Sequence, residues 1–564
     1  MSVQSAFTSQ KPGRIWLDSY PEGVPAEIEA EAYTSIVDVL EQSIERFRTR
    51  PSFANLGTEL TYGDLDLKTR DFAAYLQYQL NLKKGDRIAI MMPNLLQYPV
   101  VLFGALRAGL TVTNINPLYT PRELRHQLVD SGATCIVLLE NFCANLEKVL
   151  KDTQVESIIV TRIGDLLQFP KSTLVNFVVK HIKKMVPAYQ LLDVIDFKRV
   201  LKVGAEHRLQ PVDIDLKDIA FIQYTAGTTG AAKGVLLSHG NIVANIQQTS
   251  AWVAPFVNEG KEVIITPLPL YHIFSLTANC LLYMKIGALI YLVTNPRDLR
   301  RFVHELKPLR FTAITGVNTL FNALLNTPGF AELDFSNFKT ALGGGMAVQP
   351  SVAERWKQVT GRTLIEAYGL TETSPGVCMN PFDLEEFNGK IGPPIPSTEC
   401  CIKSDEGEIL PVGEIGELCV RGPQVMQGYL NQPEKTAAVL EPDGWFHTGD
   451  IAMMDERGFV KILERKDDMI IVSGFNVYPN EVESVVAEHP GVLEVGAIGV
   501  PDEKSGAAVK IFVVRKDPAL TEEEILQHCK KELTAYKIPK QIAFTDALPK
   551  SPVGKILRRQ LRNV

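Results

Sequence analysis

The sequence predicts an α/β fold: a large N-terminal domain of two doubly wound α/β subdomains plus a β-rich subdomain, followed by a small α+β C-terminal domain. The first observation is that short apolar stretches alternate with helical stretches up to about residue 385, as in doubly wound parallel sheets. The second is a change of composition after residue 385, where Gly, Pro and Glu punctuate short strands. The third is length, because 564 residues exceed the roughly 250–300 at which a single core stops growing.

The first subdomain contains two helix starts and several buried strands. Ser35 is followed three residues later by Asp38, an acidic variant of the capping box, which predicts that a helix begins there. Thr120 precedes Pro121 at a first helical turn, which predicts a second start. The other elements are predicted as a strand over Arg87–Met92, a helix from about Leu95 to Ala108, and strands over Thr111–Thr113, Cys135–Leu139 and Ile158–Val160.

Three further groups of elements follow. The second α/β subdomain is predicted from strands over Val263–Ile265, Leu289–Val293, Ala313–Thr315 and Lys339–Leu342, and the β-rich part from strands over Glu399–Ile402, Glu417–Val420 and Val460–Leu463. The C-terminal part is predicted as a strand from Met469, a helix over Asn480–Glu488, strands over Val495–Val500 and Val509–Val514, and a helix over Thr521–Leu533. We therefore predict domains over residues 1–465 and 466–564, with the β-rich part at about 385–465.

The composition is that of an ordinary globular protein. Hydrophobic residues make up 45% and charged residues 22%, which excludes a disordered chain, a collagen and a coiled coil. With 58 basic and 65 acidic residues the net charge is −7, so no overall attraction to nucleic acid is expected. The eight cysteines form no CxxC pair and residues 1–13 contain no apolar signal segment, so a reduced, cytoplasmic setting is expected.

Two uncharged stretches, Ile88–Leu106 and Val263–Met284, are long enough to be mistaken for membrane spans. Each contains two prolines and several polar side chains. We therefore predict that both fold as buried strand, loop and helix.

A Gly/Thr-rich loop is the candidate polyphosphate site. Residues 224–234 read YTAGTTGAAKG and follow an apolar strand over Ile219–Gln223. Glycines let backbone N–H groups approach phosphate oxygens, threonine hydroxyls donate further hydrogen bonds, and Lys233 supplies positive charge. A plain Gly/Thr turn is the alternative. Neither GxxxxGK[ST] nor GxGxxG occurs in the chain, which excludes a P-loop NTPase and a dinucleotide-binding fingerprint.

Five further motifs follow this loop. They are residues 368–372 (YGLTE), 445–450 (WFHTGD), 465–468 (RKDD), 473–479 (SGFNVYP) and 549–555 (PKSPVGK). In this order they resemble the motifs of the adenylate-forming superfamily, which contains acyl-CoA synthetases, luciferases and peptide-synthetase adenylation domains. Residues 94–99, 116–123, 311–326 and 443–467 are most similar to the bacterial long-chain fatty-acid–CoA ligases of that superfamily.

The resemblance implies a two-step reaction that uses ATP, Mg²⁺ and CoA. The carboxylate of a long-chain fatty acid would attack the α-phosphate of ATP, giving acyl-AMP and pyrophosphate. The CoA thiol would then displace AMP and form acyl-CoA. Fatty-acid uptake and degradation is the implied role.

The resemblance also assigns residues to the nucleotide site. Glu372 would bind Mg²⁺, since a hard cation prefers carboxylate oxygens, Tyr368 would stack on adenine, and Asp450 would accept hydrogen bonds from the ribose hydroxyls. The implied catalytic residues are Lys233, Thr371, Glu372 and Lys555. The implied ATP- and AMP-binding residues are Thr225, Ala226, Gly227, Thr228, Thr229, Gly230, Lys233, Gly344, Gly345, Tyr368, Gly369, Thr371, Asp450 and Arg465.

The C-terminal domain is implied to be mobile and to serve both steps. Lys555 would bridge the substrate carboxylate and the α-phosphate and so offset their repulsion, although a solvated basic tail is the alternative for this run. Asp467 occupies the position of the family's hinge. Rotation about it would present Ser473 and Gly474 to CoA.

The implied acyl pocket is formed by His272, Gly316, Val317 and Gly343, where a satisfied core histidine is the alternative for His272. The chain departs from the family pattern at Ala226, Ala232 and Val553. All three departures keep the neighbouring glycines and lysines, so activity is expected to survive.

A basic amphipathic stretch over residues 171–186 is the candidate membrane contact. Apolar residues recur along it at Val175, Val178, Val179, Ile182 and Val186, and Lys171, Lys180, Lys183 and Lys184 lie among them. Such a stretch can lie on an anionic bilayer surface, so peripheral contact with the inner membrane is one prediction and a helix packed on the core is the other.

Other readings of the whole chain stay open. One is a ligase for an aryl or medium-chain acid, and another is a non-catalytic lipid-binding protein with a ligase fold. A peptide-synthetase module is not expected, because no carrier domain precedes Val564. A homodimer is a further prediction, because members of the family often pair through the large domain.

Overall fold

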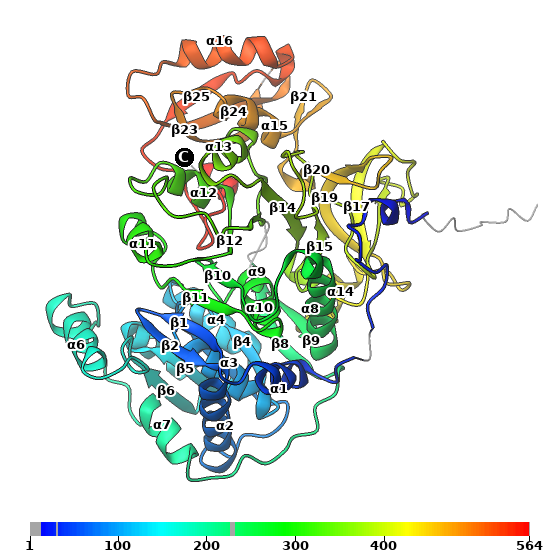
Figure 1. Cartoon of the computed structure of the whole chain (residues 1–564). Helices are drawn as coiled ribbons and strands as arrows, with labels where there is room; N and C mark the ends of the chain where they lie inside the picture. The colour runs from blue at the N-terminus through cyan, green and yellow to red at the C-terminus, as the bar shows by residue number, and fades with distance from the viewer. Residues whose placement is uncertain (1–12, 30–31, 226–231, 503, 563–564) are drawn as a thin grey trace, which may run out of the picture.

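The computed structural model describes residues 13–29, 32–225, 232–502 and 504–562. Two eight-stranded sheets with flanking helices form most of the large domain, and a four-stranded sheet lies beside them, drawn in yellow in Figure 1. The C-terminal part, in orange and red, covers one end of the large domain. The predicted fold class is confirmed.

The first eight-stranded sheet has the order β18-β9-β8-β4-β3-β5-β6-β7. Its parallel strands are β3 (Arg87–Met91), β4 (Thr111–Asn114), β5 (Cys135–Leu139), β6 (Ser157–Thr161), β7 (Ile195–Asp196) and β8 (Ile219–Thr225). Strands β9 (Lys233–Ser238) and β18 (Gly428–Tyr429) extend it in the antiparallel sense. The helices of this part are α1 (Ile36–Phe47), α2 (Tyr62–Tyr78), α3 (Gln97–Arg107), α4 (Pro121–Ser131), α5 (Cys143–Glu147), α7 (Phe197–Gly204) and α8 (His239–Val253).

The second eight-stranded sheet has the order β15-β14-β13-β12-β10-β11-β1-β2. Its strands are β10 (Val263–Thr266), β11 (Leu289–Leu292), β12 (Ala313–Gly316), β13 (Thr340–Gly343), β14 (Leu364–Gly369), β15 (Gly376–Met379), β1 (Pro51–Asn55) and β2 (Thr58–Thr61). The helices α11 (Leu299–Leu306), α12 (Asn318–Leu325) and α13 (Pro350–Thr360) accompany it. Strands β1 and β2 were not predicted, and in Figure 1 these blue strands lie beside green ones from the middle of the chain.

The β-rich part forms an antiparallel sheet of β16 (Glu399–Lys403), β17 (Ile415–Arg421), β19 (Phe446–Met454) and β20 (Val460–Arg465), with α14 (Pro433–Ala437) nearby in the chain. The C-terminal part contains β21 (Ile470–Val472), β22 (Phe475–Val477), β23 (Val492–Asp502), β24 (Gly506–Arg515), β25 (Gln541–Phe544), α15 (Pro479–Ala487), α16 (Glu522–Glu532) and α17 (Arg558–Leu561). One hydrophobic cluster there draws its buried residues only from the range 470–533. This separate core agrees with a C-terminal folding unit, whose boundary at residue 466 stays a prediction.

The predicted helix starts are confirmed. The Ser35 hydroxyl accepts a hydrogen bond from the Asp38 N–H at 3.1 Å, and Thr120 and Thr521 each form a full capping box. Each cap satisfies a backbone N–H that the first helical turn leaves without an intrahelical partner.

The two apolar stretches are buried inside the large domain. Ile88–Leu106 folds into β3 and α3, and Val263–Met284 into β10 and a helical run of α9 (Ile273–Ser275), η6 (Leu276–Leu281) and α10 (Leu282–Lys285). Among the described residues, no helix is both long and apolar enough to cross a bilayer. The prediction of buried strand, loop and helix is confirmed.

The amphipathic stretch differs from its prediction in the face that it exposes. It forms α6 (Lys171–Phe177) and a π-helical turn, η4 (Val178–Ile182), which stand out at the left of Figure 1. Of the predicted apolar residues only Ile182 is well exposed, at 64%, while the four valines are half-buried. The exposed apolar side chains are those of Phe169, Leu174, Phe177, Ile182 and Met185, which we call the α6 surface.

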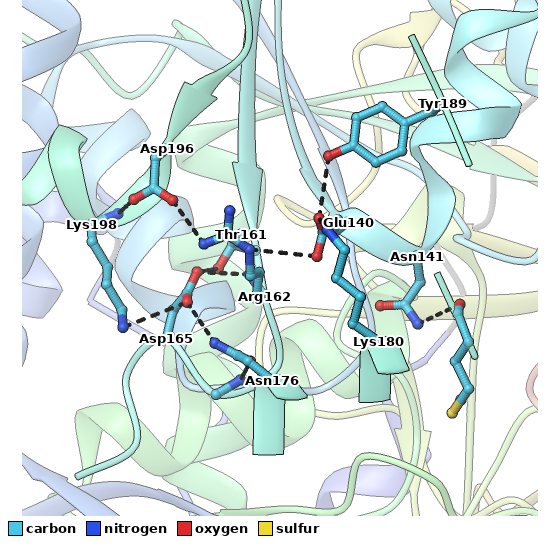
Figure 2. A network of polar contacts seen from close by, with 12 residues as sticks. Glu140, Asn141, Thr161, Arg162, Asp165, Asn176, Lys180, Tyr189, Asp196 and Lys198 are labelled. Carbon is cyan, nitrogen blue, oxygen red and sulfur yellow. Dashed lines mark hydrogen bonds and ion pairs between the residues drawn. The ribbon is translucent and has the colours of Figure 1, made fainter. Parts of the chain in front are cut away.

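Polar contacts hold the inner side of α6 and η4 to the large domain (Figure 2). Lys180 Nζ lies 2.8 Å from Oε1 of the buried Glu140, which Arg162 and Tyr189 also contact. Asn176 Nδ2 donates to Oδ1 of the buried Asp165 at 3.2 Å. Because ion pairs and hydrogen bonds do the anchoring, the helix does not have to bury its larger apolar side chains.

Candidate active site

A cavity of about 2390 Å³ lies between the large domain and the C-terminal part. Asn318, Gly344 and Leu370 line it, one or two residues after the ends of β12, β13 and β14. The cavity therefore lies at the carboxyl ends of parallel strands, where open α/β sheets bind ligands. The sequence-predicted residues that line it are Thr225, Lys233, His272, Gly344, Gly345, Tyr368, Gly369, Thr371, Glu372, Asp450, Arg465, Asp467 and Lys555.

The other predicted site residues lie elsewhere. Ala226, Gly227, Thr228, Thr229 and Gly230 lie outside the described residues. Gly316, Val317 and Gly343 are buried and do not line the cavity. Ser473 and Gly474 form the exposed turn between β21 and β22, away from the cavity wall.

Three of the predicted nucleotide-binding side chains contact one another. The Tyr368 hydroxyl donates a hydrogen bond to Asp450 Oδ2, and Arg465 Nε lies 3.3 Å from Asp450 Oδ1. Asp450 and Arg465 are directly opposed on β19 and β20, which places both side chains on one face of that sheet. Burial raises the pKa of Tyr368 well above its usual value and the adjacent Asp450 raises it further, so the hydroxyl remains a donor. Asp450 is 4% exposed and its carboxylate is therefore fixed at the wall of the cavity.

A second group joins Glu372 to Lys233 through Tyr429, a residue that was not predicted. The Tyr429 hydroxyl donates to Glu372 Oε1 at 2.8 Å, and Lys233 Nζ lies 4.5 Å from the centre of the Tyr429 ring. A cation at this distance from an aromatic face is attracted to it. Tyr429 therefore orients both the predicted metal ligand and the predicted phosphate-binding lysine.

The residues around Glu372 fit a magnesium ion that is shared with phosphate. Within the part of the chain that the structure describes, no group of three His, Cys, Asp or Glu side chains could hold a metal ion. Mg²⁺ is commonly bound by one or two carboxylates together with substrate phosphates and water, rather than by a protein cage. Glu372 lines the same cavity as Lys233, so it can supply that single carboxylate.

Lys555 reaches the cavity from the C-terminal part. Burial, and then the charge of Arg465, lowers the pKa of Lys555 to about 8, while Asp450 opposes the shift. His272 also faces the cavity, and its Nδ1 accepts a hydrogen bond from the Phe274 N–H at 3.3 Å. Burial, and then the charge of Lys555, lowers the pKa of His272 to about 4, so its ring is neutral at pH 7. Because Lys555 is buried in the wall of this cavity, the alternative that it belongs to a solvated basic tail is wrong.

A buried carboxyl in the cavity wall was missed. Glu366 is 6% exposed, lines the cavity and accepts a hydrogen bond from the Val348 N–H at 3.1 Å. Burial raises the pKa of Glu366 to about 8, although the hydrogen bond from the Val348 N–H opposes the shift. The available signal was a lone carboxyl within the apolar strand Leu364–Ala367, two residues before Tyr368.

The cavity and the two-part architecture agree with matches to known protein families. A profile described as AMP-binding enzyme matches residues 40–430, and one described as AMP-binding enzyme C-terminal domain matches residues 481–555. The chain belongs to the family of AMP-binding enzymes.

Individual relatives cover nearly the whole chain. A protein named long-chain-fatty-acid–CoA ligase from Escherichia coli O6:H1 is 56% identical over 552 residues, 98% of either chain. One of the same name from Haemophilus influenzae is 52% identical over 553 residues, again 98% of either chain. In fold, the chain is similar to the crystal structure of the anthranilate CoA ligase AuaEII with anthranoyl-AMP, with a TM-score of 0.84 and 23% identity over 95% of this chain and 98% of that chain.

Proposed function

We propose that this protein is a long-chain fatty-acid–CoA ligase that forms an acyl-adenylate from ATP and then transfers the acyl group to CoA. The observation that carries the proposal is that side chains from separate motifs, among them Lys233, Tyr368, Asp450 and Lys555, line one cavity. The identity of 56% to a protein with that name supports the choice of substrate.

The large domain is proposed to bind the nucleotide. Asp450 accepts hydrogen bonds from the ribose hydroxyls, because its carboxylate has acceptor positions beyond those used by Tyr368 and Arg465. Tyr368 presents its ring to the adenine. Lys233 neutralises phosphate charge, and the glycines at 344 and 345 let the nucleotide approach the backbone.

Glu372 is proposed to hold Mg²⁺ together with the phosphate oxygens of ATP. When bound, the ion would supply positive charge that draws electron density from the phosphates. Tyr429 holds the Glu372 carboxylate in place through its hydroxyl, which leaves the second carboxylate oxygen for the ion.

Lys555 is proposed to neutralise the carboxylate and the α-phosphate as they approach each other. The second step needs a different face of the C-terminal part, and Asp467 is the proposed hinge. The exposed turn that contains Ser473 and Gly474 lies away from the cavity in the arrangement described here, so a rotation is required before it meets CoA.

The test is release of AMP in the presence of ATP, Mg²⁺ and CoA with a panel of acids: octanoate, laurate, palmitate, oleate and benzoate. Highest kcat/KM on palmitate or oleate is expected. Highest kcat/KM on benzoate or octanoate would move the assignment to an aryl or medium-chain ligase. No turnover on any acid would favour the non-catalytic lipid-binding alternative.

We also propose that the protein is cytoplasmic and contacts the inner membrane peripherally through the α6 surface. Exposed large apolar side chains that gather on one helix are costly in water and are typical of interaction sites. Lys183 and Lys184 are exposed beside them, which complements the negative charge of a bilayer surface.

Lys180 is not proposed as a lipid contact, because it pairs with the buried Glu140. Neutralising it would leave a buried carboxylate without its partner and disturb the anchoring of η4. The informative variant therefore combines Lys183→Gln with Lys184→Gln, and a second variant combines Leu174→Ser with Phe177→Ser.

Co-sedimentation with phosphatidylglycerol vesicles tests this proposal. Both double variants are expected to bind several-fold less than the unmodified protein, and binding to phosphatidylcholine vesicles is expected to be weak for all. The matched control is Lys530→Gln with Lys531→Gln, a lysine pair at the end of α16. Equal binding by all variants would contradict the proposal.

A homodimer is a further proposal on assembly that rests on the resemblance alone. Light scattering of the purified protein at several concentrations tests it, and a mass near 62.5 kDa throughout would contradict it.

A further inference from the structure

Arg558 lies three residues after Lys555 and makes more charged contacts than a solvated residue would. Its side chain is 13% exposed. Nε and Nη2 bind both carboxylate oxygens of Glu483 at 3.0 and 2.8 Å, and Nη2 also donates to Asn480 Oδ1 at 2.6 Å. Nη1 lies 3.6 Å from Asp468 Oδ2 and donates to Glu464 Oε1 at 2.7 Å. The contact with Glu464 differs from the others because Glu464 belongs to β20 of the large domain.

Glu464 accepts hydrogen bonds from two residues of the C-terminal part. It is 1% exposed, and its second carboxylate oxygen accepts the Asn480 N–H at the start of α15 at 2.9 Å. The adjacent Leu463 carbonyl accepts a hydrogen bond from Asn480 Nδ2 at 3.1 Å. Burial raises the pKa of Glu464, and the charge of Arg558 and the backbone N–H groups of Arg465 and Asn480 oppose this shift.

These contacts join residues on either side of the proposed hinge at Asp467. Glu464 precedes the hinge, while Asn480, Glu483 and Arg558 follow it. A rotation about Asp467 moves the last three together, because α15 and the arginine are already joined by the pair with Glu483. It separates them from Glu464, so the contact with Glu464 is specific to the arrangement in which Lys555 is in the cavity.

Two further contacts join α12 to the C-terminal part, one to the loop that carries Lys555 and one to β23. Thr319 Oγ1 in α12 donates to the Gly554 carbonyl at 2.9 Å, and Asn322 Nδ2 donates to the Leu493 carbonyl at 3.0 Å. Gly554 has φ +90°, and a Cβ there would lie 2.9 Å from Thr319 Oγ1, so the loop fits against α12 only as glycine. The loop before Lys555 thus docks on α12, and the segment after it on Glu464.

We infer that Arg558 is a positioning residue for the first half-reaction: by pairing with Glu464 across the hinge it stabilises the arrangement that places Lys555 in the cavity. This inference rests on the proposed function. Its consequence is that the two half-reactions depend on Arg558 and Glu464 unequally, since acyl transfer to CoA needs the pair to be broken.

The experiment measures the half-reactions separately. The first is pyrophosphate release from ATP and palmitate without CoA, and the second is palmitoyl-CoA formation from synthetic palmitoyl-adenylate and CoA. Glu464→Gln and Arg558→Gln are expected to lower kcat of the first at least tenfold and to leave the second within twofold or faster. Arg558→Lys keeps one charged contact and is expected to recover part of the loss.

Arg562→Gln is the matched control. Arg562 pairs with Asp468 at 2.8 Å, and both residues follow the hinge, so this pair is not broken by rotation. Both half-reactions are expected to be unchanged. Equal loss of both half-reactions in Glu464→Gln, or selective loss of the second, would overturn the inference.

A measurement without substrate separates this inference from the proposed function. Dyes on Glu332→Cys in the large domain and Lys530→Cys in α16 report domain arrangement by energy transfer between single molecules. Glu464→Gln is expected to deplete the population with the arrangement described here. An unchanged distribution would overturn the inference even for an active ligase, whereas absence of pyrophosphate release by the unmodified protein would count against the proposed function alone.

Discussion

The two sides of the cavity are built differently. On the large-domain side, Tyr368, Asp450 and Arg465 are fixed to strands and to one another, and Asp450 is 4% exposed. On the C-terminal side, Lys555 stands on a loop whose position depends on contacts across the domain boundary, such as that of Gly554 with Thr319. Under the proposed function, the site that binds nucleotide in both steps is preformed, whereas the residue proposed for one step is carried on the part proposed to rotate.

The largest effect is expected from a substitution on the C-terminal side of the cavity alone. Lys555→Ala removes the positive charge that is proposed to offset repulsion in the first half-reaction, so pyrophosphate release should fall by about a hundredfold or more. Palmitoyl-CoA formation from palmitoyl-adenylate should stay within threefold. A comparable loss in that second reaction would contradict the division of labour between the two sides.

The next largest effect is expected from substitutions on the large-domain side of the cavity. Asp450→Asn keeps the shape but removes the charge that pairs with Arg465, and hydrogen bonds to charged groups contribute about 1.5–3 kcal/mol. A loss of roughly tenfold to a hundredfold in kcat/KM for ATP is expected. Tyr368→Phe removes one contact of the same carboxylate and is expected to cost less. Because the proposed site also holds AMP, both half-reactions should slow, unlike in Lys555→Ala.

The pH dependence sharpens the contrast. The pKa of Lys555 is lowered from 10.5 to about 8, so the charged form needed for the first step is lost as the pH rises through about 8. The kcat/KM for pyrophosphate release should fall about tenfold per pH unit above that value, because this parameter reports the free enzyme. The rate of the second half-reaction should not fall in this pH range. The same fall in both half-reactions would contradict the assignment of the group to Lys555.

The smallest effect concerns Glu366 and stability. The pKa of Glu366 is near 4.5 when exposed and about 8 when folded, so between these values the folded protein holds a proton that the unfolded chain releases. Stability contributed by this group therefore falls as the pH rises through this window. Glu366→Gln should be more stable than the unmodified protein at pH 8, by about 1 kcal/mol or more, and equal to it near pH 4.5. Thermal unfolding at both pH values tests this. A stability difference between the two proteins that is the same at both pH values would contradict the prediction.

Local signals predicted much of the fold. Ser35, Thr120 and Thr521 carry capping side chains that act within three residues, so their helix starts were readable. Strand β19 was missed because Gly449 and polar residues interrupt its apolar pattern, although burial alternates along its length. The placement of β1 was not readable, since its partner β11 lies far along the chain.

The candidate site was predicted in its motifs but not in its contacts. Motif residues such as Asp450 and Lys555 do line one cavity. The bond of Tyr429 to Glu372 spans 57 residues and that of Arg558 to Glu464 spans 94, so no local pattern could have indicated them. The exposed apolar residues of α6 differ from the predicted ones for a similar reason, because the carboxylates that anchor this helix, Glu140 and Asp165, come from other elements.

The pairing of β1 with β11 also affects how the chain folds during synthesis. Phe53 is opposite Ile290, so 237 residues must be made before β1 meets its partner. At about 5–20 residues per second that takes roughly 12–47 seconds. A two-stranded hairpin of β1 and β2 is marginally stable by itself in water. The N-terminal segment therefore leaves the ribosome with an unpaired strand edge, and the first subdomain is joined to the second only once β11 has been made.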